Sequence, residues 1–339
     1  MNKKTLNKFR HILVEHRDTL DTWLKSNSES KEVHLGGAPV QEVEKVVSQH
    51  TEALERINRG EFGQCTECSG DIEPERLELD FTTCVCLDHY SESQLRLLER
   101  DLELAAKVQR QLLPHAVPVL PGVQIAAHTE PAQVVGGDYF DFFSYPDGSQ
   151  GVVIADVMGK GLSASMLMSN LQASLRILGP EHPELYSLAN RLNELFLHNV
   201  KLISFISMFL VRIDENAGIV HYCNAGHNPA IRWEAASGTI HWLKPTGPAI
   251  GLTRKPSFKL KELPFSSGDI LLLYTDGLVE AQNPGDDEDN EFGKERLATY
   301  VKEHFHQSAD VFLAGLRETV KDFAGGFHDD VTLVVIKSI

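Results

Sequence analysis

The sequence is short of positive charge and lacks long apolar runs. Its 339 residues include 32 Lys and Arg against 48 Asp and Glu, so the formal net charge is −16. A chain this acidic is a poor candidate for wrapping nucleic acid through its phosphates, although a local basic face stays open. The richest apolar run, ILLLY at 270–274, is far shorter than the roughly 18 residues of a membrane span. We therefore expect neither nucleic acid nor a membrane among its direct partners.

A secretion signal is also missing from the start of the sequence. The first 20 residues, MNKKTLNKFRHILVEHRDTL, carry charges throughout and contain no apolar segment of the kind that signal peptides have. Hydrophobic residues make up 42% and charged residues 24%, which excludes a wholly disordered chain. These features predict a soluble, cytoplasmic protein of two or three domains.

Cysteine is scarce, and four of the five cysteines lie in one short segment, 65–86. Without a secretion signal, such a cluster indicates metal binding before disulfides. Cys65 with Cys68 and Cys86 with His89 each place two ligands in one turn, and two such turns complete a tetrahedron around a structural Zn²⁺. Cys84 is set aside because the residue three positions after it cannot ligate a metal. The alternative is a set of reduced cysteines without a metal.

Three segments differ in pattern. Residues 1–90 contain two stretches of helical spacing, 1–26 and 40–57, which flank a Ser- and Gly-rich loop and predict a helical hairpin ahead of the cysteines. Residues 91–113 predict a linker helix with Ser91 as its N-cap. Three prolines, at 114, 118 and 121, end that helix. The remaining segment, 114–339, predicts a separate domain.

The predicted linker helix carries an apolar seam at alternating separations of three and four, which is the spacing of a coiled coil. The seam consists of Leu95, Leu98, Leu102, Ala105, Gln109 and Leu112. It covers only about three heptads, so two interpretations stay open. The helix pairs with the same helix of a second chain in a homodimer, or it packs on its own domain.

Short runs rich in β-branched or large apolar residues predict strands after residue 121. They are VQIAAH, GVVIAD, FISMFLVRI, IVHYCN, ILLLYT and VTLVVIK. Two consecutive amphipathic helices are expected at 162–178 and 185–200, and a third helical region at about 294–323. Because two helices sit together and several strands follow, the order favours an α+β layered domain over a doubly wound parallel sheet.

Several aspartates stand where strands end and glycine-containing loops begin. They are Asp138, Asp156 and Asp276, together with the pair Asp329 and Asp330. A single Asp at such a corner is usually turn chemistry, but the ends of several strands can converge at one edge of a sheet. Clustered carboxylates need a cation, and oxygen ligands suit Mg²⁺ or Mn²⁺. Two such ions, about 3.5–4 Å apart, can polarise a phosphoryl group and activate water.

The sequence contains no recognisable motif of another catalytic mechanism. It has no GxSxG elbow, and the GKG at 159–161 lacks the glycine spacing of a Walker A loop. His227, in NAGHNP, is either an acid or metal ligand or a histidine that stabilises its loop.

The same carboxylate segments carry a family resemblance. The ordered set GGDYFDF, ADVMGKGLSASMLM, NAGHNPA, GPAIGL, LLLYTDGLVEAQN, FGKERL and DDVTLVV, over roughly 115–339, resembles the SpoIIE/RsbU branch of the PPM metal-dependent serine/threonine phosphatases. The resemblance implies an α-β-β-α sandwich of two antiparallel sheets with a dinuclear Mn/Mg centre. It implies that Asp156 bridges both ions, that Asp138 and the Val157 carbonyl serve one ion, and that Asp276 and Asp329 serve the other.

Two positions depart from the eukaryotic branch of that family. Met158 stands where that branch carries a histidine proposed as general acid, and no arginine precedes Asp138 to hold the phosphate. Lys160 is a candidate for the phosphate contact, and the alternative is an ordinary surface lysine.

A second resemblance covers about residues 1–95. The hairpin and the segment RINRGEFGQCTECSGDIEPERLELDFTTCVCLDH resemble the TraR/DksA zinc-finger family. His89 replaces the commoner cysteine, and the hairpin tip SNSESKEVHLGG lacks the paired aspartates with which that family acts on RNA polymerase.

Together the two resemblances imply a regulatory phosphatase. Its expected substrate is a phosphorylated anti-sigma-factor antagonist in a partner-switching pathway. The alternatives are a TraR/DksA-like regulator that binds RNA polymerase and has a degenerate phosphatase domain, and an enzyme that acts on small phosphate esters only.

Overall fold

The computed structural model describes most of the chain. The described residues are 6, 9–10, 13–14, 17–18, 21, 40–73, 76–77, 82–159, 161–199, 205–214, 218–284, 290–327 and 329–339. The chain divides into two compact units, Met1–Asp101 and Leu102–Ile339. Within the described residues, none of the helices has the length and hydropathy that a membrane crossing requires.

The first unit is built on helix α3 (Val40–Arg59), which confirms the helix predicted from Val40 onward. Its buried face, Ala53, Leu54 and Ile57, packs in one small core with Phe9 and with further residues of the cysteine segment. The described residues between 6 and 21 are helical, as the spacing predicted, whereas the loop expected at 26–39 lies outside the described residues. A short 3-10 helix, η2 (Leu87–His89), follows Cys86.

Helix α5 (Glu92–Leu112) begins in the first unit and ends in the second. Ser91 caps it as predicted: the Ser91 N–H donates to Gln94 Oε1 at 2.9 Å, and the Gln94 N–H donates to Ser91 Oγ at 3.3 Å. This reciprocal arrangement is a capping box.

The seam predicted on α5 is only partly exposed. Gln109 is buried, and Leu102, Ala105 and Leu112 are half-buried. The large apolar side chains of α5 that are exposed are Leu97, Leu98, Leu104 and Val108. The second interpretation, packing on the helix's own domain, therefore describes the C-terminal part of the seam.

The second unit contains two five-stranded antiparallel sheets. The first has the order β1 (Val123–Glu130), β10 (Val331–Ser338), β9 (Ile270–Tyr274), β6 (Ala230–Glu234) and β7 (Thr239–Leu243). The second has the order β2 (Tyr139–Ser144), β3 (Gln150–Val157), β4 (Ile206–Asp214), β5 (Ile219–Ala225) and β8 (Lys261–Pro264).

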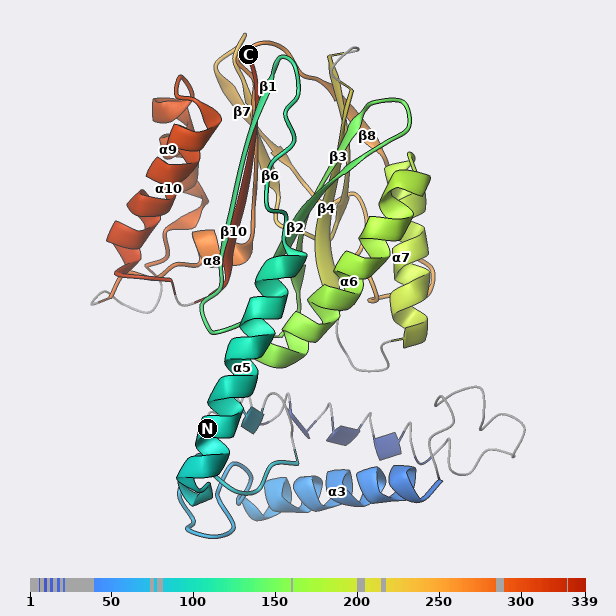
Figure 1. Cartoon of the computed structure of the whole chain (residues 1–339), viewed down its shortest axis with the longest axis vertical. Coiled ribbons are helices and arrows are strands. Elements are labelled where there is room, and N and C mark those ends of the chain that lie inside the picture. The colour runs from blue at the N-terminus through green and yellow to red at the C-terminus, as the bar shows by residue number, and fades with distance from the viewer. Residues whose placement is uncertain are drawn as a thin grey trace. The chain divides into compact units, whose positions relative to one another are not determined.

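Helices cover the outer faces of both sheets. Helices α6 (Gly161–Glu181) and α7 (Leu185–Asn199) lie on the second sheet. The first sheet is covered by α9 (Gly293–His304) and α10 (Ala309–Ala324), with the short α8 (Asp276–Val279) at the end of β9 (Figure 1). The single helical region expected at 294–323 is thus two helices. The layers are helix, sheet, sheet and helix, which confirms the α+β sandwich.

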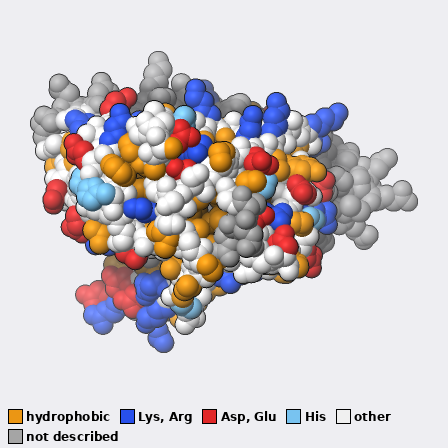
Figure 2. Space-filling model, turned by 90° about the horizontal axis from the view of Figure 1, so that it is seen from above, with side chains coloured by type: hydrophobic (Ala, Val, Ile, Leu, Met, Phe, Trp, Pro, Cys, Tyr) orange, Lys and Arg blue, Asp and Glu red, His pale blue; other side chains and the backbone are white. Residues whose placement is uncertain are grey.

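Side chains alternate between the layers along each central strand. On β3, Ile154 faces the core between the sheets, whereas Val153 and Ala155 face α6 and α7. On β10, Val334 faces the core between the sheets and Val335 faces α10. Because both faces of the central strands are buried, these strands read as continuous apolar runs in the sequence. On the face shown in Figure 2, acidic and basic side chains are interspersed.

Candidate functional site

Four strand ends bring the predicted carboxylates together. Asp138 precedes β2, and Asp156 is the last residue but one of β3, its antiparallel neighbour. Asp276 follows β9, and Asp329 precedes β10, which is again an antiparallel pair. Antiparallel pairing places the start of one strand beside the end of the next. The charges of Asp276 and Asp329 act on Asp156, so the two pairs of strand ends face one another across the sandwich.

Burial and mutual repulsion make these carboxylates hard to ionise. Burial, with the neighbouring Asp156 charge, raises the pKa of Asp138 well above its usual range. Burial and the charges of Asp276, Asp329 and Asp330 raise the pKa of Asp156 to about 7. Raised carboxyl pKa values at converging acids are the electrostatic signature of a cation site, because a divalent cation reverses the repulsion. The donors are all oxygen atoms, which suits Mg²⁺ or Mn²⁺.

Three glycines let the loops approach these carboxylates closely. A Cβ atom at Gly136 would overlap the Asp330 carboxylate, and one at Gly277 would overlap the Asp330 carbonyl. A Cβ atom at Gly137 would lie 2.8 Å from the Val157 carbonyl oxygen. The Val157 carbonyl therefore borders the loop that carries Asp138.

Thr275 is a site residue that the sequence reasoning missed. Its hydroxyl donates to Asp138 Oδ2 at 2.7 Å, and the Thr332 N–H donates to the Thr275 hydroxyl at 2.9 Å. Thr275 is fully buried, so the bond fixes the orientation of the Asp138 carboxylate. The signal was present in the TDG sequence, where the residue before Asp276 is a hydroxyl donor.

Asp330 holds the loop before β2. Its Oδ1 accepts the Ala132 N–H at 2.8 Å, and its Oδ2 accepts the Gly137 N–H at 2.7 Å. Both oxygens thus accept backbone bonds, which supports assigning the ligand role to Asp329. Glu280, the exposed C-cap of α8, lies near enough for its charge to contribute to the raised pKa of Asp156. The sequence reasoning had passed over it in LVEAQN.

His227 lies fully inside the domain, beside the carboxylate strands. Its Nδ1 lies 2.7 Å from the hydroxyl of Ser207, which pairs with Asp156 across β3 and β4. The His227 N–H donates to Asn224 Oδ1 at 2.8 Å. Burial lowers the pKa of His227 to about 4, so the ring is neutral at pH 7. These contacts favour the interpretation of a histidine that stabilises its loop. Lys160 lies outside the described residues.

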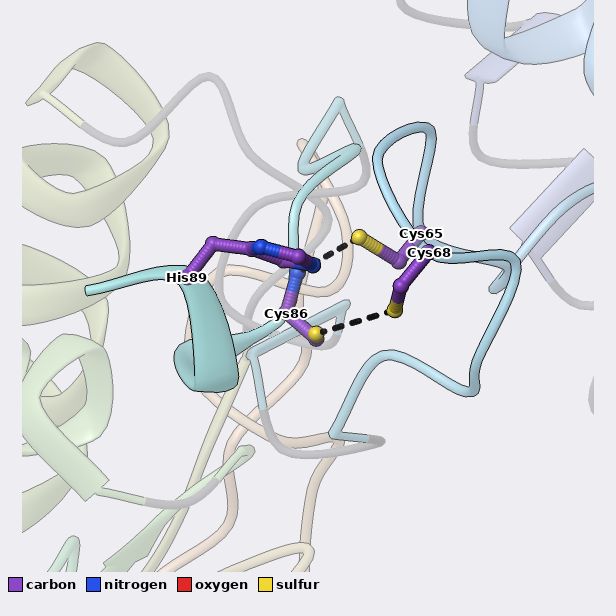
Figure 3. A group of neighbouring side chains, drawn as sticks. All are labelled: Cys65, Cys68, Cys86 and His89. Carbon is purple, nitrogen blue, oxygen red and sulfur yellow. Dashed lines mark hydrogen bonds between the residues drawn. The ribbon is translucent and has the colours of Figure 1, made fainter.

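The four predicted zinc ligands form a second cluster, in the first unit (Figure 3). One ligand atom from each of Cys65, Cys68, Cys86 and His89 lies within 4.8 Å of the others. Cys68 Sγ and Cys86 Sγ are 3.7 Å apart, and the Cys86 N–H donates to Cys65 Sγ at 3.4 Å. Burial opposes ionisation of Cys65, but backbone N–H donors outweigh it and lower its pKa to about 6. Cys84 is exposed and lies outside this group.

An ion pair between Arg76 and Glu73 supports the turn that carries Cys86 and His89. Arg76 donates to the Val85 carbonyl at 2.8 Å and to the Tyr90 hydroxyl at 2.9 Å. Glu73, which pairs with Arg76, accepts the Leu87 N–H at 2.9 Å. These bonds orient the turn that carries Cys86, in the way that outer-shell partners orient metal ligands.

The family model of stage II sporulation protein E (SpoIIE) matches residues 146–338. The chain is 29% identical over 246 residues to the phosphoserine phosphatase RsbU of Bacillus subtilis (strain 168), which covers 71% of this chain and 70% of that protein.

Two solved structures share the fold. The RsbU and RsbW domains of Rv1364c from Mycobacterium tuberculosis match with a TM-score of 0.59 and 27% identity, over 67% of this chain and 63% of that one. The SiaA-PP2C domain of Pseudomonas aeruginosa matches with a TM-score of 0.63 and 19% identity, over 72% of this chain and 98% of that one.

Proposed function

The chain belongs to the SpoIIE family, and from this premise we propose that it is a metal-dependent phosphatase of phosphoserine or phosphothreonine in a regulatory protein. The observation that carries the proposal is the convergence of Asp138, Asp156, Asp276 and Asp329, with raised pKa values at Asp138 and Asp156. The phosphoserine phosphatase RsbU, similar over 71% of this chain, supports the reaction class.

In the proposed site, five oxygen donors would hold two Mn²⁺ or Mg²⁺ ions. The donors are the carboxylates of Asp138, Asp156, Asp276 and Asp329 and the carbonyl of Val157. Ions bound there would polarise a phosphoryl group and lower the pKa of water, which is the chemistry that hydrolysis without a covalent enzyme intermediate needs.

The protein's own residues set the geometry of this centre. Thr275 orients the Asp138 carboxylate through its hydroxyl, and Asp330 holds the backbone of the preceding loop. The charge of Asp156 opposes ionisation of Asp138, and a doubly charged cation between the two carboxylates would relieve this repulsion and favour their ionised forms. The neutral His227 supports Ser207 on the strand beside Asp156. Lys160 remains the candidate for the phosphate contact.

We further propose that the substrate is a phosphorylated anti-sigma-factor antagonist in a partner-switching pathway, which places the reaction in the cytoplasm. The RsbU and RsbW domains of the Mycobacterium tuberculosis protein, joined in one solved structure, support a pathway of this kind. The TraR/DksA-like zinc module then serves as a sensor or docking unit, and we propose one structural Zn²⁺ on Cys65, Cys68, Cys86 and His89.

The test of the proposed function is Mn²⁺-dependent phosphate release from such a phosphoprotein. We expect Asp156→Asn and Asp276→Asn to lower turnover by more than about 100-fold, because each removes a charged ligand. Asp310→Asn, a change at an exposed Asp on α10, is the matched control and should leave turnover unchanged.

Equal turnover by wild type and Asp156→Asn at saturating Mn²⁺ would overturn the mechanism. Phosphate release from p-nitrophenyl phosphate, but from none of the phosphoproteins, would favour an enzyme that acts on small phosphate esters only. Binding to RNA polymerase without any phosphate release would favour the TraR/DksA-like regulator.

A further inference from the structure

The side-chain amide of Gln109 makes two hydrogen bonds to one backbone residue of the candidate site. Its Nε2 donates to the Gly136 carbonyl at 2.6 Å, and the Gly136 N–H donates to its Oε1 at 3.1 Å. Gln109 lies on α5 and is 8% exposed, so water does not replace these bonds. The amide therefore satisfies both polar groups of Gly136 in the way that a neighbouring strand would.

Gly136 is part of the loop that positions Asp138. Asp330 accepts the N–H groups of Ala132 and Gly137, so it holds this loop from the side of β10. Gly136 cannot shift toward Asp330, because even a Cβ atom there would overlap the carboxylate. The loop is thus clamped between Asp330 and Gln109.

Among the residues that the structure describes, the rest of α5 offers few other contacts through which this helix could hold the loop. Toward its C-terminus, Gln172 on α6 donates to the Leu112 carbonyl at 3.4 Å, and Leu113 packs against the core under α6. Leu104 and Val108 are exposed. A cavity of about 620 Å³ borders the end of the helix, lined in part by Lys107, Arg110 and Phe140. Gln109 makes the hydrogen bonds from α5 to this loop, so a small shift of α5 would reach the loop through Gln109.

We propose that Gln109 is a positioning residue: its amide holds Gly136 and thereby sets where Asp138 stands in the cation site. The consequence for cation binding rests on the proposed function, whereas the hold on the loop does not. The position of α5 then determines how well Asp138 can serve as a ligand.

Gln109 is the one polar member of the seam predicted on this helix. A buried glutamine is a poor coiled-coil residue, but its amide matches the donor and acceptor of a backbone residue in geometry. A methionine of similar length would fill the same space without either bond.

The experiment compares wild type with Gln109→Met, and Gln111→Met on an exposed position of the same helix is the control. The first readout is amide hydrogen exchange of residues 131–138 in metal-free protein, with strand β4 as the internal reference for global folding. The second is the dissociation constant of Mn²⁺ from calorimetry. We expect Gln109→Met to lower protection of 131–138 and to weaken Mn²⁺ binding by about 10-fold or more, with β4 unchanged. High Mn²⁺ should restore most of kcat.

A second variant, Gln109→Glu, keeps the test decisive if the methionine variant folds poorly. A protonated glutamic acid has one donor and one acceptor and can replace the amide, whereas the carboxylate repels the Gly136 carbonyl. Protection of 131–138 relative to β4 should therefore be near wild type at pH 5 and lost at pH 8.

Unchanged loop protection and unchanged Mn²⁺ affinity in both Gln109 variants would overturn the proposal. An equal effect of Gln111→Met would also overturn it. If the loop responds as expected but wild type releases no phosphate, the positioning role stands and the proposed function fails.

Discussion

Buried polar residues determine the arrangement of the site at the scale of single side chains. Thr275 and Asp330 each use their hydrogen bonds on the loop and carboxylate around Asp138. Asp141 on β2, 1% exposed, pairs with the half-exposed Arg176 at 2.6 Å. Removing Arg176 would leave the buried Asp141 carboxylate without its charge partner. Substitutions of Thr275, Asp330 or Asp141 should therefore change the arrangement of the site, although none of these side chains is proposed to contact the substrate.

His227 gives a pH-dependent prediction at this scale. Its pKa of about 4 in the folded protein lies below the value near 6.5 of an unfolded histidine. Between these values the unfolded state binds more protons, so folding stability falls as pH falls from 6.5 toward 4. The cost at pH 5 is about 2 kcal/mol. We expect His227→Gln to lose less free energy of unfolding than wild type between pH 7.5 and pH 5 in urea denaturation.

The exposed His306 provides the control for this measurement, since His306→Gln should follow the wild-type pH profile. Parallel profiles for wild type and His227→Gln would show that the buried ring is not the source of the acid sensitivity.

The aspartates of the site could be predicted from the sequence, because an Asp where a strand ends and a glycine-containing loop begins is a local pattern. It did not predict Thr275 or Gln109, whose partners lie 137 and 27 residues away. The role of such residues depends on which loop the fold brings to them. The sequence therefore identified the acidic residues of the site better than the residues that support them.

At the scale of helices and strands, burial on both faces explains which elements could be predicted. Strands β3, β4, β9 and β10 are buried on both sides and read as apolar runs. Strands β2, β6, β7 and β8 were missed. Strands β7 and β8 are short and partly exposed, whereas β2 and β6 are largely buried but carry charged or polar residues among their apolar ones. Their pairing partners, rather than their own residues, determine that they form strands.

Helix α5 carries the prediction at this scale. We propose that a second copy of the chain pairs with the exposed stripe of Leu97, Leu104 and Val108, whose members repeat at seven and four residues. Burying a Leu side chain contributes about 1.5–3 kcal/mol, so Leu104→Glu with Val108→Glu should abolish a dimer. Sedimentation of wild type and this variant measures the effect.

A matched double variant at exposed polar positions of α5, Glu103→Gln with Gln111→Asn, should leave the mass unchanged. If wild type stays a monomer at tens of micromolar, the stripe is not a dimer contact.

At the scale of the whole molecule, the chain combines two units of different stability. The second unit has three extended cores, whereas the first has one small core that includes two of the four proposed zinc ligands. A core this small draws much of its folding free energy from a bound metal. The two units should therefore respond differently when metal is removed.

Cys68→Ser tests this expectation. It should lose zinc and lower amide protection of α3, while the strands of the second unit keep theirs. Cys84→Ser, a change at the other exposed cysteine, should retain one zinc per chain. Loss of zinc in Cys84→Ser with retention in His89→Ala would show that the proposed ligand set is wrong.

The central claim is that the aspartates at four strand ends form one cation site. Its most direct test is calorimetric titration of Mn²⁺ into metal-depleted wild type and Asp156→Asn, with Asp310→Asn as the control. We expect two Mn²⁺ ions per chain in wild type and in the control, and loss of both in Asp156→Asn, because this carboxylate is the proposed bridge. Wild type that binds no Mn²⁺, or an Asp156→Asn variant that binds it as wild type does, would contradict the account.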